Sequence, residues 1–337
     1  MRRVDEVSPD ALEIDCEQVA AAIVSTLRHI VGRELRRQGA VLGLSGGIDS
    51  SVTAALCALA FGRERTVALL MPERESGETT LDLGLEVAEA IGIETVQEEI
   101  TPILEAAGCY ERRNDAVREV IPGFTAGWRW KIVLPPLLGS DAYRLYSIVA
   151  ESPEGEQVTA RLPAETYLAI VAATNFKQRV RKMLEYHHAD RLNYAVVGTP
   201  NRLEYDQGFF VKIGDGAADV KPIAHLYKTQ VYRLGAHLGI PEAVLARIPT
   251  TDTYSLPQTQ DEFYFSLPYE KLDLCLYAHN HALPPESVAG SVGLSPADVA
   301  RVFHDIEQKR RATRYLHLPP LLLGPVPEVP GTAAVTD

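Results

Sequence analysis

The sequence predicts an α/β fold built on an open, parallel, twisted sheet with helices on both of its faces. Two observations predict it. Short apolar runs alternate along the chain with longer stretches in which apolar residues recur at helical spacing, and this alternation of strand and helix is typical of parallel sheets. Most of the short runs are also apolar, as expected of strands that are buried on both faces, whereas the run over 94–97 is a weaker strand signal.

The first hundred residues contain three predicted strands and the helices between them. Val19, Ile23 and Leu27 recur at helical spacing and indicate the first helix. The next apolar run lies between a glycine and a Ser-Gly-Gly turn, which is typical of a short buried strand. The predicted elements are, in order, a helix over 15–37, a strand over 40–44, a helix over 50–61, a strand over 66–71, a helix over 81–91 and a strand over 94–97.

The middle of the chain is less regular and is interpreted as an insertion over about residues 121–160. It contains Pro135, Pro136, Gly139 and a Pro-Glu-Gly turn signal, with one possible strand over 143–150. Regular periodicity then resumes. The predicted elements of the second half are a helix over 163–188, a strand over 193–197, and helices over 225–238 and 296–311. Residues 1–317 are therefore expected to form one domain, followed by a proline-rich tail over 318–337.

Composition excludes some classes of function. The chain of 337 residues carries a net charge of -12, and an acidic surface repels the phosphates of a nucleic acid, so no nucleic-acid partner is expected. The four cysteines include no CxxC pair, which disfavours a zinc ribbon or a dithiol redox site. Neither a signal peptide nor a membrane-spanning stretch is apparent, so we expect a cytoplasmic protein without a membrane partner.

The turn after the first strand is the strongest local signal. A buried strand runs into Ser-Gly-Gly-Ile-Asp-Ser, which opens directly into a helix. Glycines let the backbone approach a ligand closely, and the free amides of such a turn converge on an anion. Asp49 would repel a phosphate directly, so a bridging Mg²⁺ explains it best. The residues predicted to bind a nucleotide phosphate here are Gly43, Leu44, Ser45, Gly46, Gly47, Ile48, Asp49 and Ser50.

Two common nucleotide-binding patterns are absent from this turn. It has no Lys of the GxxxxGK(S/T) type and no GxGxxG. Taken alone, a glycine turn capped by Ser and Asp is also common in proteins without any ligand. The whole string between strand and helix is more specific, and it resembles the SGGxDS pyrophosphate loop of the N-type ATP pyrophosphatases.

Further motifs narrow the resemblance. Residues 198–204 and 208–219 read GTPNRLE and GFFVKIGDGAAD, which is similar to the GT(D/N)xxE…GFFTKxGDGxxD signature of ammonia-dependent NAD synthetases. Residues 175–181 resemble the NxxxRxR segment of that family, and residues 249–252 resemble its PTxD turn. The resemblance runs from about Leu42 to Lys309 and implies an adenine nucleotide alpha hydrolase-like fold.

The resemblance implies roles for single residues. Glu204 would share Mg²⁺ with Asp49 as the catalytic and metal-binding pair. The implied ATP contacts outside the loop are Thr199, Lys228 and Thr250. The implied contacts to deamido-NAD are Arg179, Lys212, Asp219 and Lys309. From the residues alone, four of these have an ordinary alternative: a solvated loop carboxylate for Glu204, a solvated helix charge for Arg179 and Lys228, and a turn cap for Thr250.

The function implied by the resemblance is ATP-dependent amidation of deamido-NAD to NAD through an acyl-adenylate, with ammonia as nitrogen donor and release of AMP and pyrophosphate. A homodimer is also implied, and a separate glutaminase subunit stays open. The chain departs from the family at Pro200-Asn201 and at Gln308, so a same-fold amide synthetase for another acid is an alternative. A tRNA-modifying ATP pyrophosphatase and a nucleotide-binding protein without catalysis are the remaining alternatives.

Overall fold

The computed structural model describes residues 6–135, 137–138, 145–250, 254–324, 326 and 328–329. Its centre is a four-stranded sheet in the order β3-β2-β1-β7, in which every pair of neighbours is parallel. The strands are β1 (Ala40–Gly43), β2 (Thr66–Leu70), β3 (Glu94–Gln97) and β7 (Ala195–Val196). The predicted strands over 40–44, 66–71, 94–97 and 193–197 are thus confirmed.

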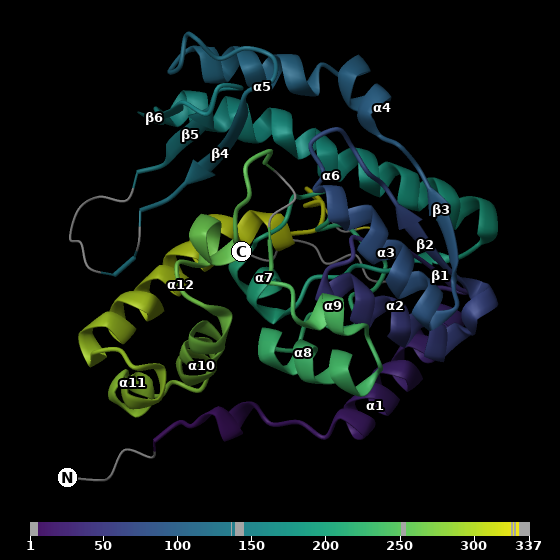
Figure 1. The fold of residues 1–337 in the computed structure, drawn as a ribbon. Coiled ribbons are helices and arrows are strands. Elements are labelled where there is room, and N and C mark those ends of the chain that lie inside the picture. The colour runs from purple at the N-terminus through teal and green to yellow at the C-terminus, as the bar shows by residue number, and fades with distance from the viewer. Residues whose placement is uncertain are drawn as a thin grey trace.

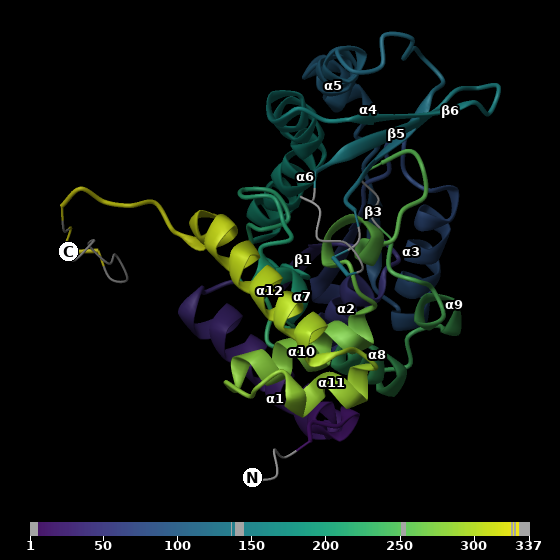
Figure 2. The same cartoon turned by 90° about the vertical axis from the view of Figure 1, so that its left-hand side faces the viewer.

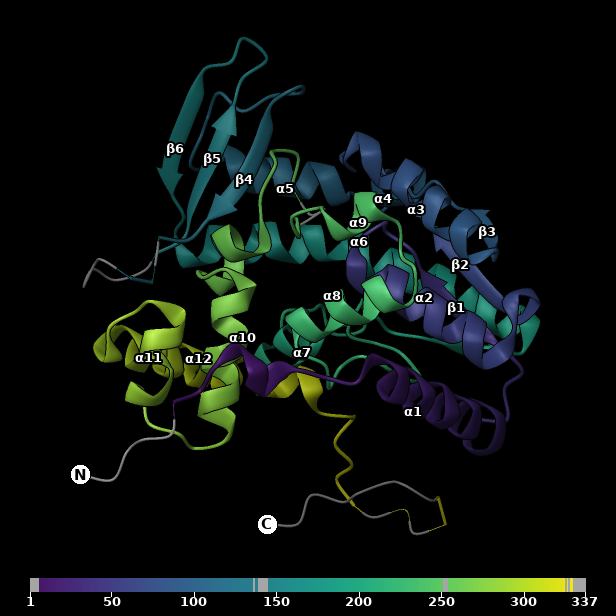
Figure 3. The same cartoon turned by 60° about the horizontal axis from the view of Figure 1, so that its bottom comes forward.

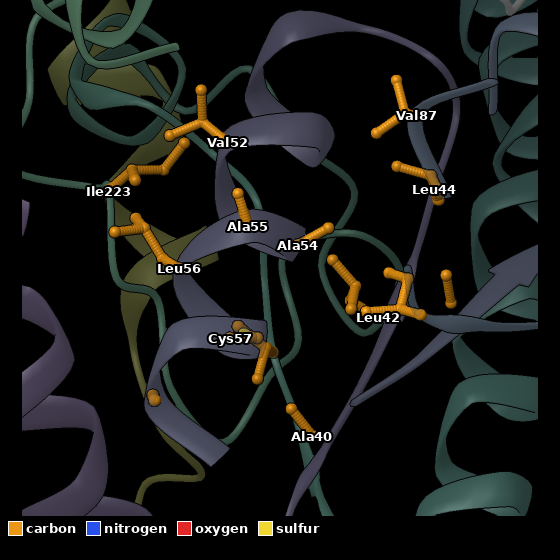
Figure 4. Close-up of a cluster of buried hydrophobic side chains, with 14 of the residues drawn as sticks. Ala40, Leu42, Leu44, Val52, Ala54, Ala55, Leu56, Cys57, Val87 and Ile223 are labelled. Carbon is orange, nitrogen blue, oxygen red and sulfur yellow. The ribbon is translucent and has the colours of Figure 1, made fainter. Parts of the chain in front are cut away.

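Helices cover both faces of this sheet, as Figure 1 shows. Leu42 of β1 packs on one side with α1, α2, α3 and α8, whereas its neighbour Val41 packs on the other with α4, α5 and α6. Figure 4 shows the first of these cores, where side chains of β1 and α2 meet. The helices are α1 (Cys16–His29), α2 (Ile48–Phe61), α3 (Glu78–Ile91), α4 (Thr101–Ala106), α5 (Cys109–Arg118), α6 (Ala164–Leu192) and α8 (Lys228–His237). The predicted fold class is confirmed.

The C-terminal third adds a helical layer with its own apolar core, seen below and beside the sheet in Figures 1 and 2. It consists of α10 (Tyr269–Asn280), α11 (Glu286–Val292) and α12 (Pro296–His317). The predicted helices over 225–238 and 296–311 are found as α8 and α12, while α10 and α11 were not predicted. Shorter elements are α7 (Arg202–Gln207), α9 (Glu242–Leu245), 3-10 turns at Pro9–Leu12 and Arg63–Arg65, and π turns at Ile30–Glu34 and Asp261–Phe265.

The segment interpreted as an irregular insertion contains a regular antiparallel sheet, which stands apart from the central sheet in Figure 3. Its strands are β4 (Arg129–Val133), β5 (Ser147–Glu151) and β6 (Gln157–Arg161), in the order β4-β5-β6. The possible strand over 143–150 overlaps β5, although residues 143 and 144 lie outside the described residues. The alternating side chains Trp130, Ile132, Ile148 and Ala150 are fully buried against α5 and α6.

Helix α12 ends at His317, where the proline-rich tail was predicted to begin. The described part of the tail leads away from the body in Figure 2, and Leu321 and Leu323 are exposed there. Across the described residues, the helices lack the combined length and apolarity that a membrane crossing requires.

Candidate active site

A cleft of about 590 Å³ opens beyond the carboxyl ends of β1 and β7. The strand order reverses between these two strands, and ligands of open α/β sheets bind at such a switch point. The predicted residues that line the cleft are Gly43, Leu44, Ser45, Gly47, Ile48, Asp49, Ser50, Arg179, Thr199, Glu204, Lys212, Lys228 and Thr250. Gly46, Asp219 and Lys309 are outside this lining.

Gly46 shapes the loop from behind. Its φ of 68° lies in the left-handed region, and a Cβ at this position would lie 2.7 Å from the Cβ of Leu83 in α3. Any side chain would therefore strain the backbone and push the loop off α3. Gly46 makes the tight turn possible, while its neighbours face the cleft.

The serines of the loop hold its conformation. The hydroxyls of Ser50 and Ser51 both donate to the carbonyl of Gly47, at 3.0 and 2.8 Å, and the hydroxyl oxygens of Ser45 and Ser50 lie 3.2 Å apart. Helix α2 begins after Gly47 without a side-chain cap from the described residues. The amides of its first turn thus remain for an anion in the cleft.

Asp49 lies in the first turn of α2, which follows β1, and Glu204 lies in the first turn of α7, which follows the neighbouring strand β7. Asn201 connects them, because its side-chain amide donates to Asp49 Oδ1 at 3.0 Å and its backbone amide donates to Glu204 Oε2 at 3.2 Å. Asn201 also caps α7, accepting the Glu204 amide at 3.2 Å. The Pro200-Asn201 departure from the family pattern therefore builds part of the site.

Lys228 completes this cluster by forming an ion pair with Asp49. Burial raises the pKa of Glu204 to about 8, and the Asp49 carboxylate adds to the rise. Burial works against the charge of Lys228, yet Asp49 and Glu204 outweigh it and raise the pKa of Lys228 above its usual value. The cluster therefore holds the Lys228 cation, which stays protonated, next to the Glu204 carboxyl group, which is much less acidic than usual.

Asp273 of α10 fixes the position of Lys228. Its two carboxylate oxygens accept the backbone amides of Lys228 and Thr229, at 3.3 and 2.7 Å. These are the first amides of α8, so Asp273 caps that helix from another element. Burial raises the pKa of Asp273 to about 6, despite the two amides that favour the carboxylate.

As the pH rises, we expect the free energy of unfolding of the wild type to fall relative to that of the Asp273→Asn variant. Between the ordinary pKa of 3.8 and the folded value of about 6, the folded protein holds the Asp273 proton more tightly than the unfolded chain. Raising the pH through this window therefore lowers the contribution of Asp273 by about 2–3 kcal/mol. Urea unfolding of both proteins from pH 4 to pH 7 measures the difference, and a difference that is constant over this range would contradict the expectation.

The four residues predicted to contact deamido-NAD do not lie together. Arg179 is an exposed side chain at the cleft. Lys212 also lines the cleft, but donates to the carbonyls of Tyr315 and Leu318 at the end of α12, at 2.6 and 3.2 Å.

The other two lie elsewhere. Asp219 is exposed beside β7 and accepts the amide of Val196 at 2.8 Å. Lys309 donates to the carbonyl of Tyr264 at 2.7 Å and pairs with Asp305.

A buried ionic network that was not predicted borders the cleft. Lys177 of α6 donates to Glu73 at 2.8 Å and to Glu75 at 2.7 Å, both in the segment after β2. Arg113 binds Glu75 with two hydrogen bonds, and the Tyr110 hydroxyl donates to Glu73 at 2.6 Å. The network joins α5, α6 and the segment after β2.

A second buried pair faces the phosphate loop. Lys182 Nζ lies 2.5 Å from Glu185 Oε2, and both residues line the cleft. A Cβ on Gly43 would lie 3.1 Å from the Glu185 carboxylate. The lack of a side chain at Gly43 therefore lets α6 approach the end of β1.

The fold and the cleft define a nucleotide-binding α/β protein whose phosphate loop follows the first strand. The family described as NAD synthase matches residues 19–121 and 150–315. The chain is similar to the NH(3)-dependent NAD(+) synthetase of Rhizobium meliloti (strain 1021), with 57% identity over 96% of each chain. It is 54% identical to that of Mesorhizobium japonicum, over 92% of this chain and 98% of the other. The chain belongs to the NAD synthase family.

Solved structures show the same fold. An NMN synthetase from Francisella tularensis has a TM-score of 0.63 and 24% identity, covering 93% of this chain and all of its own. An NH3-dependent NAD synthetase from Campylobacter jejuni has a TM-score of 0.60 and 22% identity, covering 92% of this chain and all of its own. These structures confirm the predicted fold, and the family match together with the similar relatives confirms the predicted family.

Proposed function

We propose that the protein converts deamido-NAD, ATP and ammonia to NAD, AMP and pyrophosphate in the cytoplasm. The observation that carries the proposal is the cluster of Asp49, Asn201 and Glu204 at the mouth of the phosphate loop. Relatives that are 54–57% identical over most of the chain carry the name NH(3)-dependent NAD(+) synthetase, which supports this substrate.

The reaction has two steps. In the first, the carboxylate of the dinucleotide attacks the α-phosphorus of ATP, giving an acyl-adenylate and pyrophosphate. In the second step, ammonia attacks the acyl carbon, the amide forms and AMP is released. The enzyme contributes mainly by aligning nucleophile and leaving group and by stabilising charge that develops between them.

The loop and its neighbours would hold the triphosphate of ATP. The amides after Gly47 suit the leaving pyrophosphate, since a helix N-terminus favours an anion. Lys228 lies beside the loop and would exchange its partner Asp49 for a phosphate oxygen when ATP and a metal bind. Thr199 and Thr250 line the cleft and can offer hydroxyl groups to the nucleotide.

The residues of the cluster fit Mg²⁺. Within the part of the chain that the structure describes, no group of three or more His, Cys, Asp or Glu side chains gathers as a metal site, but the carboxylates of Asp49 and Glu204 share the partner Asn201. Mg²⁺ is commonly held by one or two carboxylates together with substrate phosphates, and these two residues would hold it with ATP. When bound, the ion supplies positive charge that offsets the charge of the departing pyrophosphate.

We further propose a homodimer in which a second copy completes the dinucleotide site. Arg179 and Lys212 line the cleft of one chain, whereas Asp219 and Lys309 do not. A site whose contacts are divided in this way suits completion by another copy. Light scattering combined with size-exclusion chromatography gives the mass in solution, and a mass of one chain at assay concentration would contradict the dimer.

The function is tested by incubating the protein with deamido-NAD, ATP, Mg²⁺ and ammonium. We expect NAD, AMP and pyrophosphate in equal amounts. Glutamine in place of ammonium should give little NAD, because the proposed donor is free ammonia. If ammonium also gives little NAD, and only glutamine with an added glutaminase restores the rate, a separate ammonia-supplying subunit is indicated instead. Nicotinic acid mononucleotide serves as the competing acid, and AMP formed with it but not with deamido-NAD would contradict the proposed substrate.

A further inference from the structure

The antiparallel sheet β4–β6 lies partly in a stretch that the family match skips. The NAD synthase family match stops at residue 121 and resumes at 150, so β4 and the start of β5 are outside it. The sheet nevertheless has a well-packed apolar face, with Trp130, Ile132, Ile148 and Ala150 fully buried. Because this well-packed sheet lies next to the cleft, we expect it to have a role in the candidate active site.

One edge of this sheet is occupied by residues 254–258, here called the wall segment. The Leu256 amide donates to the Trp130 carbonyl at 3.0 Å, and the Trp130 amide donates to the Ser255 hydroxyl at 2.9 Å. The Gln258 side chain donates to the Ile132 carbonyl at 2.6 Å. The wall segment thus forms hydrogen bonds with backbone N–H and C=O groups that an edge strand such as β4 would otherwise leave unpaired. Figures 1 and 3 show part of the chain between α9 and α10 beside β4.

Aromatic packing joins the wall segment to the core of the inserted sheet. The Tyr254 ring meets the Trp130 ring edge-on at 4.8 Å and the Phe263 ring at 5.2 Å. Tyr254 is buried in the same apolar cluster as β4 and β5, and both Tyr254 and Phe263 line the cleft. The core of the insertion therefore also forms a wall of the active site.

Contacts between residues 249–250 and 259–260 hold the chain together at the base of the wall segment, next to the cluster of Asp49, Asn201 and Glu204. Thr250 and Thr259 form an antiparallel bridge, and the Gln260 amide donates to the Pro249 carbonyl at 3.1 Å. The Gln260 side chain then donates to Glu204 Oε1 at 3.1 Å. A continuous set of contacts runs from β4 through residues 254–258 to the proposed metal carboxylate.

We propose that the inserted sheet is a dock for the wall segment, and that docking sets Gln260 and Thr250 in place for ATP. Gln260 is a positioning residue, because it orients Glu204 and does not itself touch the reacting atoms. The proposal rests on the proposed function for its kinetic consequence but not for the docking contact. An undocked segment would leave Glu204 without the Gln260 contact and move Thr250 at the base of the wall segment.

The test is Ser255→Ala, which removes the hydroxyl that accepts the Trp130 amide. Ser255→Thr keeps a hydroxyl and serves as the conservative variant. Thr159→Ala is the matched control, since Thr159 is exposed on β6 of the same sheet and away from the wall segment. Hydrogen exchange of the protein alone reports docking without any substrate. Steady-state kinetics with varied ATP report its consequence.

Loss of one hydrogen bond predicts that the backbone amides of residues 254–256 and 258–260 exchange about five- to tenfold faster in Ser255→Ala, with those of β5 unchanged. The KM for ATP should rise by a similar factor of about five while kcat stays within about twofold, since ATP then has to select the docked state. Ser255→Thr should restore both values, and Thr159→Ala should change neither.

Unchanged exchange in Ser255→Ala, or a fall in kcat with an unchanged KM, would overturn the dock. The double variant Ser255→Ala/Gln258→Leu extends the test, and exchange no faster than in wild type would again overturn it. Wild-type protein that makes no NAD would overturn the proposed function instead, and the exchange comparison would then decide the dock by itself.

Discussion

Asp49→Asn is expected to lower kcat for AMP formation by about 100- to 1000-fold, a range typical of losing one preorganised electrostatic contact at the reacting groups. The neutral amide keeps the size of the side chain but is a weak ligand for Mg²⁺. It also leaves Lys228, whose side chain is 3% exposed, without its ion-pair partner. Single-turnover release of AMP and pyrophosphate measures the chemical step directly.

A matched control separates this effect from general charge loss. Asp82→Asn makes the same chemical change at an exposed position of α3, and its rate should stay within about twofold of wild type, since solvated surface charges contribute little. Circular dichroism establishes that both variants are folded. Near-normal AMP production by a folded Asp49→Asn protein would show that the metal assignment is wrong.

Lys177→Met is expected to destabilise the protein by about 3–5 kcal/mol, the usual result of removing one partner from a buried ion pair. Lys177 is 2% exposed and its partner Glu73 is fully buried, so the variant leaves the carboxylate of Glu73 without its cation. Burial alone would make Glu75 less acidic, but Arg113 and Lys177 lower the pKa of Glu75 to about 2. Glu75 therefore remains charged and also depends on Lys177. Urea unfolding at neutral pH measures the change in free energy.

The double variant Lys177→Met/Glu73→Gln is the control for this mechanism. Neutralising Glu73 removes the uncompensated charge, so about 1–2 kcal/mol of the loss should return if the pair is coupled. The losses in free energy caused by Lys177→Met and Glu73→Gln could instead simply add, or Lys177→Met alone could cost less than about 1 kcal/mol. Either result would mean that water reaches the network and that its burial contributes little.

Strand β3 is only partly buried and has a weaker sequence signal, but β1, β2 and β7 could be predicted because they are buried on both faces. Their apolar runs carry a signal that needs no tertiary information, and the glycine turn after β1 marks where the first one ends. Helix α10 could not be found in this way. Leu272, Leu274, Cys275 and Leu276 are all buried, so the helix has apolar residues on several sides and lacks the one-sided pattern that identifies an amphipathic helix.

The site was predictable only where its chemistry is contained in a short motif. Asp49 and Glu204 each belong to such a motif, whereas the Asn201 amide that connects them depends on the approach of two strand ends. The charges of α6 show the limit of sequence periodicity. Lys177 and Lys182 are buried and Arg179 is exposed, because the helix lies between the central sheet and α5 and both sides meet protein.

Whether Asp49 and Glu204 share one metal ion is tested by the binding of a divalent ion to the cluster in the presence of ATP. Mn²⁺ can replace Mg²⁺ and is followed by electron paramagnetic resonance, with a non-hydrolysable ATP analogue to prevent turnover. We predict one tightly bound ion in the wild type, and an affinity that is at least about tenfold weaker in Asp49→Asn and in Glu204→Gln, a loss typical of disturbing a metal site. Equal affinity in all three proteins would mean that these two side chains do not share the ion.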